Sequence, residues 1–186
     1  FGTAIMVLGE GSGRIYALVA AGIGVVTALA AYAHWRRFHV PITIAALTGA
    51  LVATLLALLL GAYPQASQSL LWLLLAAGLG VFGGAMWWDM SDRARITRRS
   101  DVAFWLHLAA APMIAHPVFW LLGVMTGAPS AGKGIAVVLL YVLFGILALA
   151  VDRRALLVSS LVYVLYALAG LFEQFGAVSL NMALTA

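Results

Sequence analysis

Long apolar runs, separated by short segments that carry charge, glycine or proline, make up most of this chain. Six of the runs have a length that suits a membrane-spanning helix, which needs roughly 20 apolar residues to cross the hydrocarbon core. The predicted spans are 15–35, 42–62, 70–88, 102–125, 135–151 and 155–172. The pattern therefore predicts an all-α, polytopic integral membrane helical bundle over residues 15–172.

The composition excludes a water-soluble fold. Of the 186 residues 65% are hydrophobic and 9% are charged, whereas a soluble domain is typically about 25% charged. The mean hydropathy is +1.10, and the short connectors leave too few polar residues to build a water-facing surface. The lipid bilayer is therefore the predicted environment of all six runs.

Both ends of the sequence are predicted to lie outside this bundle. Residues 1–14 are interpreted as an extracytoplasmic turn at Gly9–Gly13, preceded by the tail of an upstream helix. Residues 173–186 are interpreted as an extracytoplasmic segment and the start of a further helix. On this interpretation the native chain continues beyond both ends.

Basic residues predict the orientation of the spans. Three alternate connectors hold eight of the ten basic residues, which leaves only Arg14 and Lys133 on the other side. Because short cytoplasmic loops are enriched in Lys and Arg, these connectors are predicted to be cytoplasmic, in a bacterial inner membrane, and to close three hairpins. The predicted cytoplasmic anchors are Arg36, Arg37, Arg98, Arg99, Arg153 and Arg154.

Charge and cysteine content remove several classes of function. The net charge of +4 is spread over short clusters and forms no basic face, so no nucleic-acid partner is expected. The chain has no cysteine, which excludes disulfides, thiolate metal sites and cysteine nucleophiles. The predicted partners are the lipid bilayer and other membrane subunits or further helices of the same chain.

Glycine and tryptophan positions predict how the spans pack. Gly80 and Gly84 in the third span form a small-xxx-small pair, which allows the backbone of a neighbouring helix to approach closely. We therefore expect the third span to be central in the bundle. Trp87 and Trp88 at its end match the aromatic belt that marks a membrane interface.

The fourth span carries the polar residues that are most unusual inside a membrane. Counted from Asp101 at about 1.5 Å per residue, His107 lies roughly 9 Å and His116 roughly 22 Å into the span. Pro112 and Pro117 free backbone carbonyls, one of them on Met113, and favour a kink. Two interpretations stay open: the histidines bond neighbouring helices, or His107, Pro112, Met113 and His116 line a path for protons, solutes or a ligand.

A cofactor site can also be imagined at one end of the bundle. His34 and His107 have similar predicted depths, so a haem with two histidine ligands is a hypothesis, with nearby arginines holding the propionates. No carboxylate lies in the middle of a span, which disfavours ion-coupled transport. No nucleophile motif and no spaced set of metal ligands is present, so neither catalytic residues nor a metal site are predicted.

The sequence does not determine a biochemical activity. The preferred interpretation is a non-catalytic membrane-embedded module or interaction partner, with no cofactor strongly indicated. The alternatives are a transport or permeation module that uses a kinked fourth helix, and a haem- or quinone-associated electron-transfer membrane protein.

Overall fold

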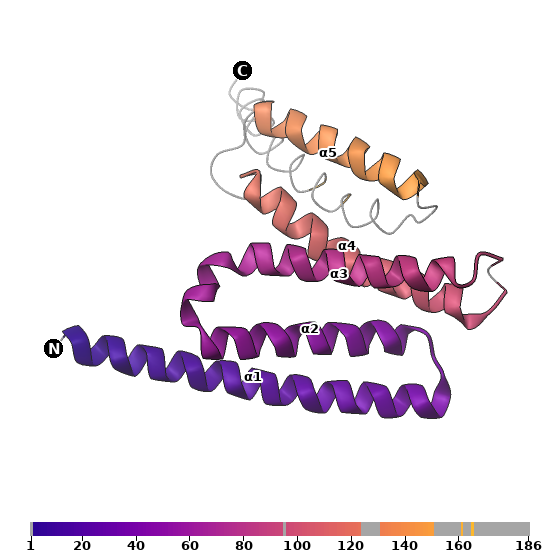
Figure 1. The fold of residues 1–186 in the computed structure, drawn as a ribbon. Helices are drawn as coiled ribbons and strands as arrows, with labels where there is room; N and C mark the ends of the chain where they lie inside the picture. Colours follow the sequence, from indigo (N-terminus) through magenta and orange to yellow (C-terminus); the bar gives the residue numbers. More distant parts are fainter. Residues whose placement is uncertain (1, 95, 124–130, 151–160, 162–164, 166–186) are drawn as a thin grey trace, which may run out of the picture. The chain divides into compact units, whose positions relative to one another are not determined.

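The computed structural model describes residues 2–94, 96–123, 131–150, 161 and 165, and this part of the chain is helical with short connectors (Figure 1). The elements are α1 (Gly2–Phe38), α2 (Ile42–Ala62), the short 3-10 helix η1 (Pro64–Ser69), α3 (Leu70–Met90), α4 (Arg98–Leu121) and α5 (Ala131–Ala150). The chain divides into two compact units, Phe1–Ala109 and Ala110–Ala186.

Five helices in the described part of the chain are long and apolar enough to cross a membrane. The all-helical class is thereby confirmed, several of the helices are long and apolar enough to span a membrane, and α2 has the predicted bounds. The sixth predicted span, 155–172, lies outside the described residues except at positions 161 and 165. The count of six spans and the three hairpins therefore stay predictions.

The beginning of α1 differs from the expected turn at Gly9–Gly13. The helix runs without a break from Gly2 to Phe38 over 37 residues, about 55 Å at ~1.5 Å per residue. Glycine costs a helix about 1 kcal/mol relative to alanine but removes no hydrogen bond, unlike proline. Helix-forming residues on both sides carry the helix through this glycine-rich stretch.

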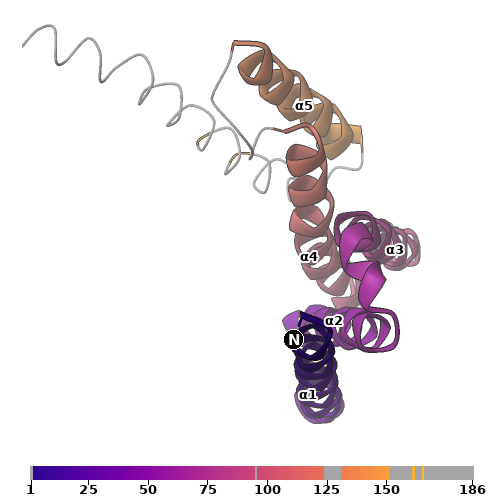
Figure 2. The same ribbon diagram turned by 90° about the vertical axis from the view of Figure 1, so that its left-hand side faces the viewer.

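An antiparallel pair of helices, α1 and α2, packs along stripes of small residues (Figures 1 and 2). The buried positions are separated by three and four residues on α1, and by eleven and seven residues on α2, spacings that keep them on one helix face. Small residues at such a seam let two backbones approach closely. The buried residues are Ala21, Gly24 and Ala28 on α1, and Thr43, Thr54 and Gly61 on α2.

Two glycines show where α1 and α2 come closest. A Cβ atom added to Gly24 would collide with the Thr54 hydroxyl and would lie 3.3 Å from the Thr54 Cβ. A Cβ atom added to Gly61 would lie 3.4 Å from the Cβ of Ala17. Glycine is therefore required at position 24 by the approach of the facing helix and not by backbone conformation.

Polar contacts join the two helices near both ends of this seam. The Arg14 Nε donates to the carbonyl of Gly61 at 2.9 Å, in the last turn of α2, where carbonyls have no partner within the helix. Near the opposite end, His34 Nδ1 and Thr43 Oγ1 are hydrogen bonded at 3.0 Å. These contacts fix the register of the pair.

Among the described helices α4 is the most buried, and the central place expected for the third span stays a prediction. In α4 56% of the most apolar window is buried, against 11–22% in the other four helices. Alanines account for much of this burial, because they admit close neighbours without the cost of glycine to the helix. The alanines with no exposed surface in this helix are Ala103, Ala110, Ala111 and Ala115.

The described core of the second unit lies between the last turns of α4 and the middle of α5. Phe119 is fully buried, and its ring meets that of Phe144 edge to face at 6.1 Å. Val137 and Ala148 extend the buried stripe of α5 at helical spacing, while large residues on its other faces are exposed. This distribution is that of a helix with one packed stripe and exposed apolar residues on its remaining faces.

Candidate functional site

The turn between α3 and α4 is organised by Asp92. Its Oδ2 accepts hydrogen bonds from the Thr97 hydroxyl at 2.6 Å and the Thr97 amide at 2.9 Å, and its Oδ1 accepts from the Ile96 amide at 3.4 Å. The Thr97 hydroxyl in turn accepts from the Arg99 amide at 3.2 Å, which makes Thr97 the N-cap of α4. This capping explains why α4 begins at Arg98, before the predicted residue 102.

This turn is expected to respond to acid. The hydrogen bond from the Thr97 hydroxyl is the main reason that the pKa of Asp92 lies below its ordinary value of 3.8. Because the folded state holds the proton less tightly than the unfolded state, the carboxylate stabilises the fold above pH 3.8 and loses this effect as the pH falls through the lowered pKa. The Thr97 amide shift, followed by NMR from about pH 5 to about pH 2, should titrate with a midpoint below 3.8.

The matched control for this titration is Asp92→Asn, which should abolish the step in the Thr97 amide shift. An amide has no proton to gain over this range. A midpoint at or above 3.8 in the wild type, or an unchanged step in the variant, would contradict the assigned role of Asp92.

His107 is the most enclosed of the polar residues whose burial is described in the first unit, with 1% of the residue surface exposed. Its Nε2 lies 3.9 Å from the Asp89 Oδ2 at the end of α3. The ring also meets the Phe82 ring edge to face at 5.0 Å. His107 therefore packs α4 against the neighbouring helix α3 and lies beside its terminal carboxylate. Both interpretations made for the histidines of this span stay predictions.

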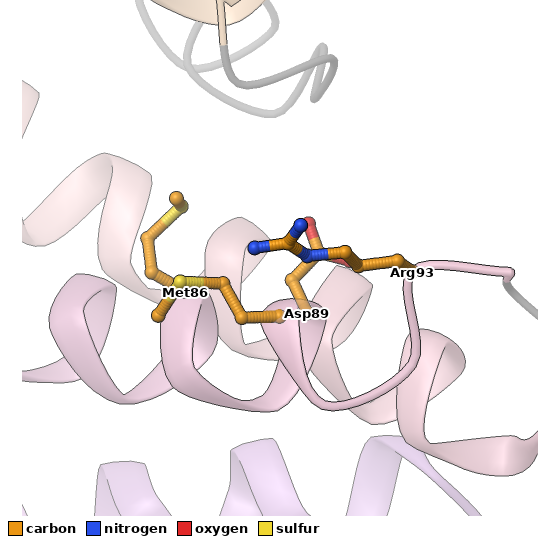
Figure 3. Close-up of a pocket in the computed structure, with 4 residues that line it drawn as sticks. Met86, Asp89 and Arg93 are labelled. Carbon is orange, nitrogen blue, oxygen red and sulfur yellow. The ribbon is translucent and has the colours of Figure 1, made fainter.

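Asp89 also lines an open cleft of about 170 Å³ at the end of α3. Its other lining residues are Met86, Met90 and Arg93, which follow the same face of the chain at helical spacing. Figure 3 shows the Arg93 side chain reaching back over the cleft toward Asp89. The site thus combines two thioethers, a carboxylate and a guanidinium, and the carboxylate connects it to the buried imidazole.

The second half of α4 carries the other predicted path residues. Pro112 and Pro117 both lie inside the helix, which continues from Arg98 to Leu121. Pro112 is exposed, whereas Met113 and His116 are half-buried. Since His107 and His116 belong to different compact units, a path that joins them stays a prediction.

The two histidines of the haem hypothesis have different partners. His34 is exposed on α1, where it is hydrogen bonded to Thr43 and its ring lies 4.8 Å from the Phe38 ring. His107 is buried beside Asp89. The described contacts do not bring the two imidazoles to a common space, so the haem site stays a prediction.

The glycines predicted to mediate packing lie on an accessible face of α3. A Cβ atom on Gly80 or Gly84 would meet no atom within 4 Å. Gly80 is exposed and Gly84 is half-buried. The close helix approach predicted for this pair is seen instead at Gly24, and the packing role of Gly80 and Gly84 stays a prediction.

Two of the arginine-containing connectors lie at the same end of the first unit. Arg98 Nη1 donates to the carbonyl of His39 at 3.4 Å, which ties the start of α4 to the turn between α1 and α2. Arg36 Nη1 donates to the Tyr32 hydroxyl at 3.1 Å, and Arg37 lies 5.6 Å from the centre of the Phe38 ring. Arg99 is exposed, Arg153 and Arg154 lie outside the described residues, and the membrane side of all these anchors stays a prediction.

Sequence reasoning missed the capping pair and the methionines of the cleft. A threonine directly before a helical run is a recognised N-terminal signal, so Thr97 was detectable. The spacing of Met86 and Met90 placed both on one helix face with Asp89, but nothing in the sequence indicated that this face borders an open space.

The chain matches no protein-family model, no curated protein and no solved structure. Its candidate site is therefore interpreted from its own chemistry: an imidazole buried beside a carboxylate that also faces an open cleft.

Proposed function

We propose that this chain is a non-catalytic membrane-embedded module that associates with another transmembrane helix through a small-residue stripe on α3. The stripe consists of Ala76, Gly80 and Gly83, all of which are exposed. Trp72 and Trp87 bracket it along the helix and are 60% and 66% exposed. This accessible stripe is the observation that carries the proposal.

The comparison with α1 supports a packing role for this stripe. Ala21, Gly24 and Ala28 on α1 are spaced by three and four residues, as are the residues of the α3 stripe, and all three are buried in the seam with α2. Inside a bilayer, helices associate through close packing of such small residues, because lipid tails offer no hydrophobic driving force. A stripe with the same spacing that remains accessible is suited to a further helix.

Hydroxyl groups within the spans support a structural role over catalysis. Each of three threonines donates to the carbonyl four residues earlier in its own helix, at 2.7–2.9 Å. Such bonds satisfy the hydroxyl locally and leave it poorly placed to act as a nucleophile. The three threonines are Thr27, Thr48 and Thr54.

Gly80→Leu is expected to reduce the size of the complex that the protein forms in mild detergent. The leucine side chain would occupy the space that the second helix needs, and the loss should be at least about tenfold in association constant. Size-exclusion chromatography with light scattering measures the complex. Gly22→Leu is the matched control, because Gly22 is also an exposed glycine in a span with no atom within 4 Å of an added Cβ.

A wild-type protein that purifies as a lone monomer would contradict this proposal, and so would an equal effect of the two leucine variants. A transport or permeation role for α4 is the second candidate. It is favoured by the placement of His107 beside Asp89 in a helix that contains two prolines.

A further inference from the structure

We propose that the cleft formed by Met86, Asp89, Met90 and Arg93 binds the headgroup of an amino phospholipid such as phosphatidylethanolamine. The site offers a cation and an anion side by side, next to two flexible apolar side chains. A headgroup with a phosphate and a primary ammonium presents the complementary charges, and its acyl chains match the methionines.

The position of the cleft suits a lipid headgroup. Its lining residues run from one turn before the end of α3 to just beyond that end at Met90. Trp87 and Trp88 lie at the same level of the helix, and tryptophan pairs of this kind mark the boundary between hydrocarbon and water. Phospholipid headgroups occupy this boundary, so the ligand is present at high local concentration.

The volume of the cleft favours the head of an amphiphile over a whole soluble ligand. The cleft measures about 170 Å³ and is open to the surroundings, whereas pockets that enclose drug-sized ligands measure roughly 300–1,000 Å³. A small polar group suits a cleft of this kind, and the acyl chains then lie outside it in the bilayer.

Each charged group of the cleft has a distinct role in recognition. The Arg93 side chain is exposed, and a guanidinium binds phosphate oxygens through paired hydrogen bonds. The Asp89 carboxylate has two oxygens and so accepts from an ammonium group while Oδ2 keeps its position 3.9 Å from His107 Nε2. A choline headgroup has no N–H to donate and a glycerol headgroup has no cation, so both should bind more weakly.

Native mass spectrometry of the full chain tests this selectivity, with equimolar phosphatidylethanolamine, phosphatidylcholine and phosphatidylglycerol of identical acyl chains. We expect the wild type to retain phosphatidylethanolamine about tenfold more than either competitor. Arg93→Gln should lower the retention of all three lipids about tenfold, because each has a phosphate. Arg99→Gln is the control: Arg99 is also exposed but does not line the cleft, so its loss should leave the retention of the three lipids unchanged.

Asp89→Asn separates the two charges of the site. It should bring the ratio of phosphatidylethanolamine to phosphatidylcholine down to about one while retention of phosphatidylglycerol does not fall, because only the ammonium contact is weakened. Since Asp89 also faces the buried His107, Arg93→Gln decides the proposal if the Asp89 variant does not fold.

Two outcomes would overturn the lipid site. They are equal retention of the three lipids by the wild type, and equal losses in the Arg93 and Arg99 variants. The lipid site does not require the α3 stripe to be occupied, so failure of one proposal leaves the other standing.

Discussion

Gly24→Ala is expected to loosen the pairing of α1 with α2 and to lower the free energy of unfolding by roughly 1–3 kcal/mol. The added methyl group would collide with the Thr54 hydroxyl, and the Thr54 Cα atom lies only 3.4 Å from the new Cβ. That hydroxyl donates to the carbonyl of Ala50 at 2.7 Å, so moving it aside breaks a hydrogen bond inside the bilayer. The collision is relieved either by turning the Thr54 hydroxyl away from the carbonyl of Ala50 or by separating the helices, and both cost free energy.

The matched control for this variant is Gly22→Ala in the same helix. An added Cβ at position 22 meets no atom within 4 Å, so alanine should instead stabilise the helix by up to about 1 kcal/mol. Reversible unfolding in mixed micelles measures both variants. In the Gly24→Ala background, Thr54→Ala should recover part of the loss, because it removes the hydroxyl that collides. Equal stabilities of the two alanine variants would show that the seam is not packed as described.

The spans were predictable because their signal is local. The apolar run at 42–62 is bounded by Pro41 on one side and by Tyr63 and Pro64 on the other. The helix α2 occupies residues 42–62. The seam of α1 was also detectable, since Ala21, Gly24 and Ala28 repeat at heptad spacing in the sequence.

The pairing of particular residues across helices was not predictable in the same way. Helices that are apolar on all sides have no amphipathic face to indicate which side packs and which side meets lipid. Asp89 lies beside His107 of α4 because of the rotation of α3 and α4 about their axes, which their apolar surfaces do not reveal. The open cleft depends on that same rotation, as well as on the turn that Asp92 and Thr97 organise.

His107→Ala is expected to lower the free energy of unfolding by roughly 2–4 kcal/mol. The side chain is 2% exposed, and its loss leaves a cavity between Phe82 and Asp89 in a tightly packed part of α4. His34→Ala is the control in reversible unfolding experiments. Because His34 is exposed, this change should cost less than about 1 kcal/mol, although the bond to Thr43 is lost.

Two further variants separate the packing of His107 from its polarity. His107→Phe keeps a ring of suitable size against Phe82 and should recover most of the loss, but it leaves the Asp89 carboxylate facing a hydrocarbon ring at a residual cost of about 1–2 kcal/mol. Adding Asp89→Asn should then regain part of that residual, because a neutral amide is cheaper to desolvate than a carboxylate. If the imidazole only fills space, the effects of His107→Phe and Asp89→Asn on the free energy of unfolding should add. A coupling free energy above about 0.5 kcal/mol between the two substitutions would show instead that His107 and Asp89 act as a pair. Such a pair would hold the carboxylate that lines the cleft at the end of α3.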